Sequence, residues 1–200
     1  MDEGAGLRER KKAATRLALH EAALRLAAEQ GPDRVTVEAI ADGANVSRRT
    51  FSNYFSSKEE ALFYGDTRRL RRLLDLLRAQ PPDESPWVAL SRAALHLTAE
   101  MYDDGEVLAW LERRRRLRGH PGLLAHQAAA YAAFERELAG ELAQRLTDPD
   151  RALRARIMAA TFLATVRVAT QHWIEHPDTP MVATLRAALA HATPAPEATS

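Results

Sequence analysis

The 200-residue sequence contains no cysteine, which excludes disulfide bonds and cysteine-based metal or redox chemistry. Alternating runs of β-branched residues bounded by turns are also missing, so the pattern argues against a sheet and predicts an all-α protein. The first twenty residues lack the apolar core of a signal peptide. We therefore expect a helical protein that remains in the cytoplasm.

Catalytic motifs are missing as well. The sequence has no nucleophile with a base at motif spacing, no glycine-rich phosphate loop and no carboxylate pair that stands out. His172 and His176 have the i, i+4 spacing of metal ligands on a helix, with Glu175 between them, but nothing supplies a clear third ligand. We therefore expect no enzymatic activity, no metal and no cofactor.

A short helical pattern followed by a turn begins at Thr36, which is a good N-cap. Val37, Ile40 and Ala41 then share one face of the expected helix. The triplet Gly-Ala-Asn at 43–45 ends this helix, because Gly and Asn adopt the left-handed backbone conformation at little cost.

A second helix is expected directly afterwards, with Ser47 as its cap. Phe51 and Phe55 are four residues apart and point back at the first helix together with Val46. The other side is polar and basic, with Arg48, Arg49, Ser52 and Asn53. Two short helices, a tight turn and a basic outer face are typical of a helix-turn-helix, whose second helix enters the major groove of DNA.

The spacing of several motifs resembles the N-terminal domain of the TetR family of bacterial transcriptional regulators. These motifs are Thr-Val-Glu-Ala-Ile-Ala from Thr36, Ala-Asn-Val-Ser from Ala44, Thr50-Phe, and Asn-Tyr-Phe-Ser-Ser-Lys-Glu-Glu-Ala-Leu ending at Leu62. The resemblance covers roughly the first quarter of the chain. Two positions depart from the family pattern: Asn45 stands where Gly is most frequent, and Ser52 where an aromatic residue is common.

The resemblance implies a three-helix DNA-binding domain joined by a long helix to a C-terminal helical domain for ligand binding and dimerisation. It also implies a homodimer on a palindromic DNA operator, acting as a repressor that a small-molecule effector releases. We divide the chain accordingly into a DNA-binding domain at 7–60, a ligand-binding and dimerisation domain at 61–192 and a disordered tail at 193–200.

The charge distribution fits this division. The net charge is only +1, but residues 7–58 hold ten Lys or Arg against six Asp or Glu, a balance of +4. The run Arg8–Lys12 is either a solvated helix start or a surface that faces phosphate. Its position beside a helix-turn-helix favours the second interpretation.

Helix boundaries are marked by caps and prolines. A first helix is expected over 7–30, with Leu19, Ala23 and Ala27 on its inner face and a stop at Gly31-Pro32. A helix that links the two domains opens at Ser57 with Glu60 as the other half of a capping box, and it ends before the break at 80–85. Ser85-Pro86, Asp148-Pro149 and Thr179-Pro180 have the cap-proline order of helix starts. The remaining helices are expected near 86–102, 105–118, 121–146, 149–176 and 179–192.

The helix at 149–176 carries the dimer prediction. From Ile157 to Thr170 it is apolar or small nearly all the way round, with only Arg167 charged. It is too short and too interrupted to span a bilayer, so both sides must be covered by protein. One side can pack on its own domain, and the other on the same helix of a second copy, with the last helix completing a four-helix bundle.

The DNA contacts follow from the helix-turn-helix. The recognition-helix residues expected to reach base edges or nearby phosphates are Arg48, Arg49, Thr50 and Asn53. The residues expected to fix the register through phosphates are Thr36, Ser47, Tyr54 and Lys58.

The effector site is less defined by the sequence. The arginine run at 113–116 is either solvated surface or a phosphate-binding rim, and this part of the chain resembles a family branch with acyl-CoA-like effectors. The aromatic residues are either core or lining of an apolar cavity, whereas Arg167 needs an anionic partner if it is buried. The candidate ligand residues are Trp110, Arg113, Phe134, Phe162 and Arg167.

Two other functions stay open at this point. An enzyme would use the helical cavity on a small metabolite, with turnover that depends on His172 or His176. An interaction adaptor would keep the helix-turn-helix shape without binding DNA, and its weak salt dependence would distinguish it from a phosphate-contacting dimer.

Overall fold

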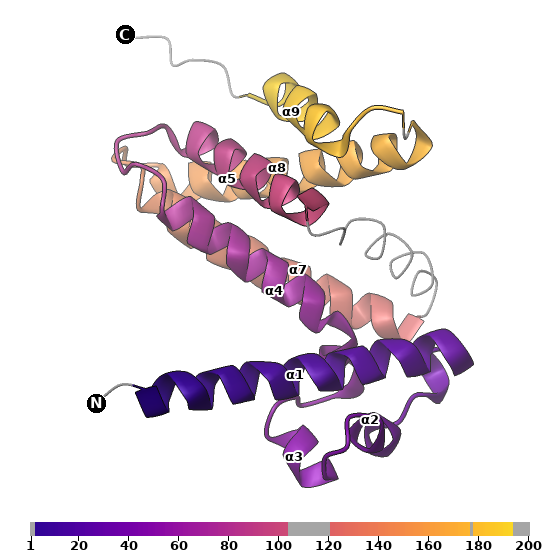
Figure 1. Ribbon diagram of the computed structural model, residues 1–200. Coiled ribbons are helices and arrows are strands. Elements are labelled where there is room, and N and C mark those ends of the chain that lie inside the picture. Colours follow the sequence, from indigo (N-terminus) through magenta and orange to yellow (C-terminus); the bar gives the residue numbers. More distant parts are fainter. Residues whose placement is uncertain (1–2, 104–120, 177, 194–200) are drawn as a thin grey trace, which may run out of the picture. The chain divides into compact units, whose positions relative to one another are not determined.

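The computed structural model describes residues 3–103, 121–176 and 178–193, which hold eight α-helices, one short 3-10 helix and no strand (Figure 1). The predicted all-α fold is therefore confirmed for these residues. The helix expected at 105–118 and all but the first residue of the tail expected at 193–200 lie outside them. In chain order the helices are α1 (Glu3–Gln30), η1 (Pro32–Arg34), α2 (Val37–Gly43), α3 (Arg48–Ser52), α4 (Lys58–Arg78), α5 (Pro86–Asp103), α7 (Pro121–Ala143), α8 (Arg151–Glu175) and α9 (Met181–His191).

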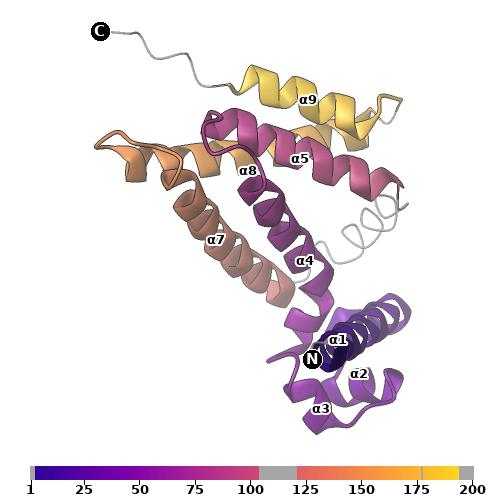
Figure 2. The same ribbon diagram turned by 60° about the vertical axis from the view of Figure 1, so that its left-hand side comes forward.

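The chain forms two compact units, of which the first combines residues 1–68 with 108–129. In this unit α2 and α3 lie on the same side of α1, as both ribbon views show (Figures 1 and 2). The inner face predicted for α1 is confirmed, because Leu19 and Ala23 are fully buried. They share one apolar core with residues from α2, α3, α4 and the start of α7, among them Ile40, Phe51, Leu62 and Leu123.

Two residues with positive φ shape the turns of this unit. Gly31 ends α1 with φ 82°, in agreement with the predicted stop. Asn45 adopts the left-handed conformation with φ 55° between α2 and α3, as predicted. The same expectation for Gly43 is wrong, since Gly43 is the last residue of α2. A Cβ at Gly43 would lie 3.0 Å from Arg25 Nη2 and 3.3 Å from Ala22 Cβ, so this glycine serves the close approach of α1 and α2.

The start of α4 resembles the predicted capping box with one change. The Glu60 amide donates to Ser57 Oγ at 3.1 Å, as the motif requires. The Glu60 carboxylate reaches one residue further back than expected and accepts from the Ser56 amide at 2.7 Å and from the Ser56 hydroxyl at 2.8 Å.

The second unit combines residues 69–107 with 130–200. Here α9 packs on both α8 and α5. The centre of the unit is filled by fully buried side chains from five helices: Leu74, Leu77, Leu90, Leu138, Leu142, Phe162 and Leu185. Such a close-packed centre supplies most of the free energy that holds helices together.

Polar contacts join the end of α4 to the end of α7 within this unit. Arg145 donates from its guanidinium to the carbonyl oxygens of Leu77 (2.6 Å), Gln80 (3.0 Å) and Pro81 (2.7 Å). These carbonyls stand at the C-terminal end of α4 and just beyond it, where backbone acceptors have no partner within the helix. One arginine therefore caps α4 from the chain that follows α7.

A second arginine pair joins α4 to α5. Arg72 Nε donates to Glu100 Oε2 at 3.1 Å, and this hydrogen bond lowers the pKa of the Glu100 carboxyl below its usual value. Glu100 therefore stays ionised at neutral pH. The pair is solvent-exposed, so its contribution to stability is small.

Two predicted helix starts are displaced. The helix expected from Pro149 begins at Arg151, and the Asp148 carboxylate accepts from Arg154 Nη1 at 2.8 Å. The helix expected from Thr179 begins at Met181. The start at Pro86 is confirmed.

Within the described ranges, no helix is long and apolar enough to cross a membrane.

Candidate nucleic-acid interface

The predicted caps of the helix-turn-helix are both formed. Thr36 Oγ1 accepts from the Ala39 amide at 3.1 Å at the start of α2. Ser47 Oγ accepts from the Thr50 amide at 3.0 Å at the start of α3 and lies 2.8 Å from Thr50 Oγ1. These hydroxyl oxygens are thus engaged within the protein, and Thr36 and Ser47 are both exposed.

The helix α3 is short but buries the expected side chains. It ends at Ser52, and Asn53 and Tyr54 form a turn before Phe55. Phe51 and Phe55 are nonetheless almost completely buried, with ring centroids 5.8 Å apart. This aromatic pair attaches α3 to the core and leaves its other side in water.

The exposed side of α3 carries the predicted basic residues. Arg48, Arg49 and Asn53 are exposed, and Thr50 is half-buried. Arg48 Nη1 lies 3.0 Å from a carboxylate oxygen of Glu38 in α2. Arg49 makes no ion pair with any residue that the structure describes. The surface therefore offers one paired and one unpaired guanidinium, together with an amide.

Tyr54 and Lys58 both have partners inside the first unit. The guanidinium carbon of Arg16 lies 5.7 Å from the centre of the Tyr54 ring. Lys58 Nζ donates to the carbonyl oxygens of Pro32 at 3.1 Å and Asp33 at 3.2 Å. An ammonium group has three donors, so one N–H of Lys58 remains for another acceptor.

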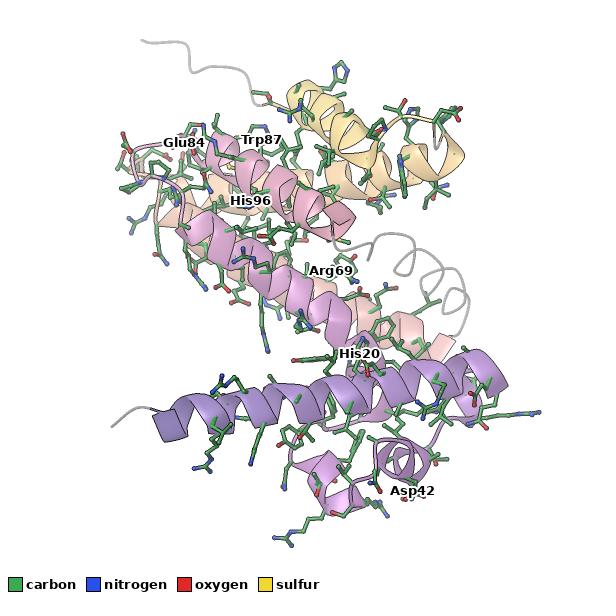
Figure 3. The ribbon with its side chains drawn as sticks, in the orientation of Figure 1. His20, Asp42, Arg69, Glu84, Trp87 and His96 are labelled. Carbon is green, nitrogen blue, oxygen red and sulfur yellow. The ribbon has the colours of Figure 1, made fainter. Side chains whose placement is uncertain are left out.

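His20 is a buried polar residue that the sequence patterns did not single out. Its Nδ1 lies 2.7 Å from the carbonyl oxygen of Ala61, and its ring meets the Tyr64 ring edge-on at 5.8 Å. Figure 3 shows His20 between α1 and the first turns of α4. A Cβ at Gly65 would lie 2.9 Å from His20 Nε2. A glycine inside a helical pattern with no turn nearby is the sequence signal that could have indicated this close approach.

The candidate ligand residues of the second unit fall into three groups. Phe134 and Phe162 are buried, and the Phe162 ring meets Trp87 of α5 edge-on at 6.5 Å. Arg167 is exposed, so it is hydrated, and the reason for expecting an anionic partner does not hold. Trp110 and Arg113 lie outside the described residues.

Two buried polar atoms on α5 have no hydrogen-bond partner in the described part of the chain. They are the indole nitrogen of Trp87, labelled in Figure 3, and the hydroxyl oxygen of Ser91 one turn later. Burying such a group without a partner costs about 1–3 kcal/mol. The two atoms therefore keep unused hydrogen-bonding capacity inside the second unit.

The two histidines with metal-ligand spacing contact each other. The rings of His172 and His176 stack with centroids 4.4 Å apart, and His176 Nδ1 lies 3.0 Å from the His172 carbonyl oxygen. Among the residues described, no group of three or more potential ligands could hold a metal ion.

One side of α8 is apolar and exposed. Leu153, Ile157 and Val168 are 60%, 57% and 56% exposed, which is high for such large apolar side chains. Beside them a groove of about 790 Å³ runs between α8 and α9, lined mainly by alanine and threonine. Large exposed apolar surfaces of this kind mark interfaces.

Comparison with known proteins gives matches along most of the chain. The family described as bacterial regulatory proteins, tetR family, matches residues 19–63, and the MftR C-terminal domain matches residues 84–195. The chain is 34% identical over 186 residues to the HTH-type transcriptional regulator TcmR of Streptomyces glaucescens, covering 90% of this chain and 82% of that protein. It is 30% identical over 185 residues to the putative mycofactocin biosynthesis transcriptional regulator MftR of Mycobacterium tuberculosis, covering 90% and 89%.

Solved structures also share the fold, among them the following two. The SmeT–triclosan complex has a TM-score of 0.57 at 21% identity and covers 89% of this chain and 91% of its own. A putative tetR family transcription regulator from a Shewanella species has a TM-score of 0.53 at 20% identity and covers 88% and 94%.

Proposed function

This chain belongs to the TetR family of bacterial regulatory proteins, and we propose that it acts as a homodimeric repressor that a small molecule releases from a palindromic operator. It is a DNA-binding transcriptional regulator. The observation that carries the proposal is α3, a capped helix with a buried aromatic side and an exposed side bearing Arg48, Arg49 and Asn53. Arg suits the bidentate contact to guanine, and Asn suits adenine.

The proposed DNA contacts form two groups, according to whether the side chain reaches a base edge or only a phosphate. Arg48, Arg49, Thr50 and Asn53 contact base edges or nearby phosphates from the exposed side of α3. Thr36, Ser47, Tyr54 and Lys58 contact phosphates and fix the register. The free N–H of Lys58 and the exposed hydroxyl of Thr36 support this role, because each keeps a donor while its other contacts hold it in place. The Ser47 hydroxyl is exposed as well and shares a hydrogen bond with Thr50 Oγ1.

The second copy packs on α8 and α9. The exposed apolar side chains of α8, Leu153, Ile157 and Val168, and the adjoining groove need cover from an apolar surface. The same helices of another copy provide that surface through a two-fold axis. We keep the domain assignment made from the sequence, with DNA binding at 7–60 and ligand binding and dimerisation at 61–192.

The effector is a hydrophobic or acyl-CoA-like small molecule bound in the second unit. The buried aromatic pair Trp87 and Phe162 makes the interior of this unit apolar, which suits an apolar ligand. The unpartnered Trp87 N–H and Ser91 hydroxyl support an acceptor atom on that ligand. The ligand must bind the DNA-released conformation more tightly, and a preference of about 1–3 kcal/mol changes operator affinity roughly 5- to 150-fold.

The test begins with selection of a duplex from a random-sequence pool by the full-length protein. Arg48→Ala with Arg49→Ala should abolish selective binding of that duplex and leave the dimer intact in light scattering. The matched control, Arg71→Ala with Arg136→Ala, removes two exposed arginines from the second unit and should bind normally. Selective binding that survives in the first variant would overturn the role of α3.

A second experiment tests the effector by adding fatty acids and acyl-CoA thioesters to the protein–duplex complex. Release of the duplex should accompany a change in tryptophan fluorescence, and Trp87→Phe should weaken the release because the indole N–H is lost. Release that is unchanged in Trp87→Phe would move the effector site elsewhere.

A further inference from the structure

The N-terminal end of α1 extends well past the core of the first unit. Every residue from Gly6 to Ala14 is exposed, and burial begins only at Thr15 and Arg16. These nine residues span roughly 14 Å of helix, since each residue adds about 1.5 Å. In Figure 1 this end of α1 reaches beyond α3.

The side of α1 that faces the helix-turn-helix can be identified from its contacts. A Cβ at Gly43 of α2 would lie 3.3 Å from Ala22 Cβ and 4.0 Å from Leu26 Cδ1. Ala22 and Leu26 therefore mark the side of α1 that packs on α2. Three and four helical turns correspond to about 11 and 14 residues.

Two cations of the exposed end fall on that same side. Lys11 precedes Ala22 by 11 residues and Arg8 precedes it by 14, so both project toward the side on which α2 and α3 lie. Arg10 lies two residues after Arg8, about 200° around the helix, and projects away.

The charges of Arg8 and Lys11 are available to a partner. Neither forms an ion pair with any residue that the structure describes, and both are exposed. The one acid in this segment, Glu9, lies 3.9 Å from Lys12 and balances that residue instead. Arg10 Nε donates to the Gly6 carbonyl oxygen at 3.3 Å.

We propose that Arg8 and Lys11 form a second DNA contact, which binds the phosphate backbone of the duplex beside the groove occupied by α3. This inference rests on the proposed function and adds to it a binding site outside the helix-turn-helix. Both surfaces lie on one side of α1 and both are cationic, so a single polyanion complements them together. The contact is sequence-independent, because guanidinium and ammonium groups reach phosphate oxygens and not base edges.

The experiment measures how the affinity of full-length protein for the selected duplex depends on salt. Wild type, Arg8→Gln, Lys11→Gln and Arg10→Gln are titrated between about 50 and about 200 mM KCl. Each lost phosphate contact reduces the slope of log K against log[salt] by about 0.9, or about 1.8 for a dimer bound at both half-sites. Arg8→Gln and Lys11→Gln should each show this loss, and Lys11→Arg should not.

Arg10→Gln is the matched control, because it removes the same charge from the same turn on the opposite side. Its slope should equal that of wild type. Equal losses in Arg8→Gln and Arg10→Gln would reveal a general charge effect and overturn the proposal, as would an unchanged slope in both Arg8→Gln and Lys11→Gln. Binding to phosphatidylglycerol vesicles that requires Arg8 and Lys11, with DNA binding unaffected, would assign the surface to a membrane and also overturn it.

Failure of the proposed function gives a different result. If wild type selects no duplex from the random pool, the repressor proposal itself fails. If wild type selects a duplex but the salt slopes of Arg8→Gln and Lys11→Gln equal that of wild type, the helix-turn-helix binds DNA without a contribution from Arg8 and Lys11.

Discussion

Arg48 on the exposed side of α3 is ion-paired with Glu38 of α2, with 3.0 Å between Nη1 and the carboxylate oxygen. Both side chains are largely exposed, at 72% and 55%. An exposed pair of this kind is weak, so a competing anion can displace Glu38 at little cost. The pair also places a carboxylate beside the proposed DNA contact, so in the proposed complex Arg48 would exchange the Glu38 carboxylate for a phosphate or a base edge.

Replacing Glu38 by Gln should strengthen DNA binding. An exposed ion pair is worth about 0.2–1 kcal/mol, and its removal spares the protein the cost of breaking it, so affinity should rise roughly 1.4- to 5-fold. Fluorescence anisotropy with the selected duplex measures the change. Asp42→Asn is the control, since Asp42 is exposed on the same face of α2 and has no side-chain partner among the described residues. An equal gain in both variants would mean that the pair itself does not matter.

Local features of the helix-turn-helix could be predicted because their causes lie within a few residues. The caps at Thr36 and Ser47 and the left-handed Asn45 each depend on a hydroxyl or a backbone conformation close by in sequence. The prediction for Gly43 was wrong because its cause is distant. That glycine is required by the approach of Ala22 from α1, which no short window of sequence contains.

Contacts between distant segments escaped the sequence patterns for the same reason. Arg145 binds carbonyl oxygens more than sixty residues away, and no charge pattern distinguishes it from other arginines. Arg167 shows the converse case. Its apolar neighbours in sequence suggested burial, but the helix has an exposed apolar side and Arg167 lies in water beside it. Burial depends on which side of a helix is covered, and that is a tertiary property.

Gly65→Ala should destabilise the DNA-binding unit. Alanine is favoured over glycine in a helix by about 1 kcal/mol, so propensity alone predicts a gain. The new methyl group would lie 2.9 Å from His20 Nε2, and the ring cannot retreat because it is buried and bonded to the Ala61 carbonyl. Overpacking of this kind costs about 1–3 kcal/mol, and urea denaturation monitored by circular dichroism should show a net loss.

A matched glycine on another helix separates these two effects. Gly140 lies in α7 with nothing within 4 Å of an added Cβ, so Gly140→Ala should raise the free energy of unfolding by up to about 1 kcal/mol. Adding His20→Ala to Gly65→Ala should remove the clash. If Gly65→Ala stabilises the protein as much as Gly140→Ala, the close approach of His20 is not rigid.

Arg145→Ala should weaken the end of α4. The guanidinium satisfies the carbonyl oxygens of Leu77, Gln80 and Pro81, and hydrogen bonds from a charged donor are worth about 1.5–3 kcal/mol. The expected loss in the free energy of unfolding is of that size, measured at fixed protein concentration because a dimer links stability to concentration. Arg151→Ala removes an exposed arginine and should change stability by less than about 0.5 kcal/mol. Equal effects of the two substitutions would contradict a cap by Arg145.

Ile157→Glu should separate the proposed dimer into monomers. Ile157 is 57% exposed in the single chain and lies on the same side of α8 as Leu153, so a second copy that covers α8 would bury it. A carboxylate on both sides of a two-fold axis would then be buried without a partner and would face its own copy. Sedimentation velocity at a concentration where wild type is dimeric measures the outcome.

Val88→Glu is the control, because it introduces the same charge at an apolar α5 residue that is 45% exposed, and it should leave the dimer unchanged. A monomer binds one half-site, so Ile157→Glu should also lose the affinity that comes from engaging two half-sites together. Full dimerisation of Ile157→Glu would place the interface on another surface.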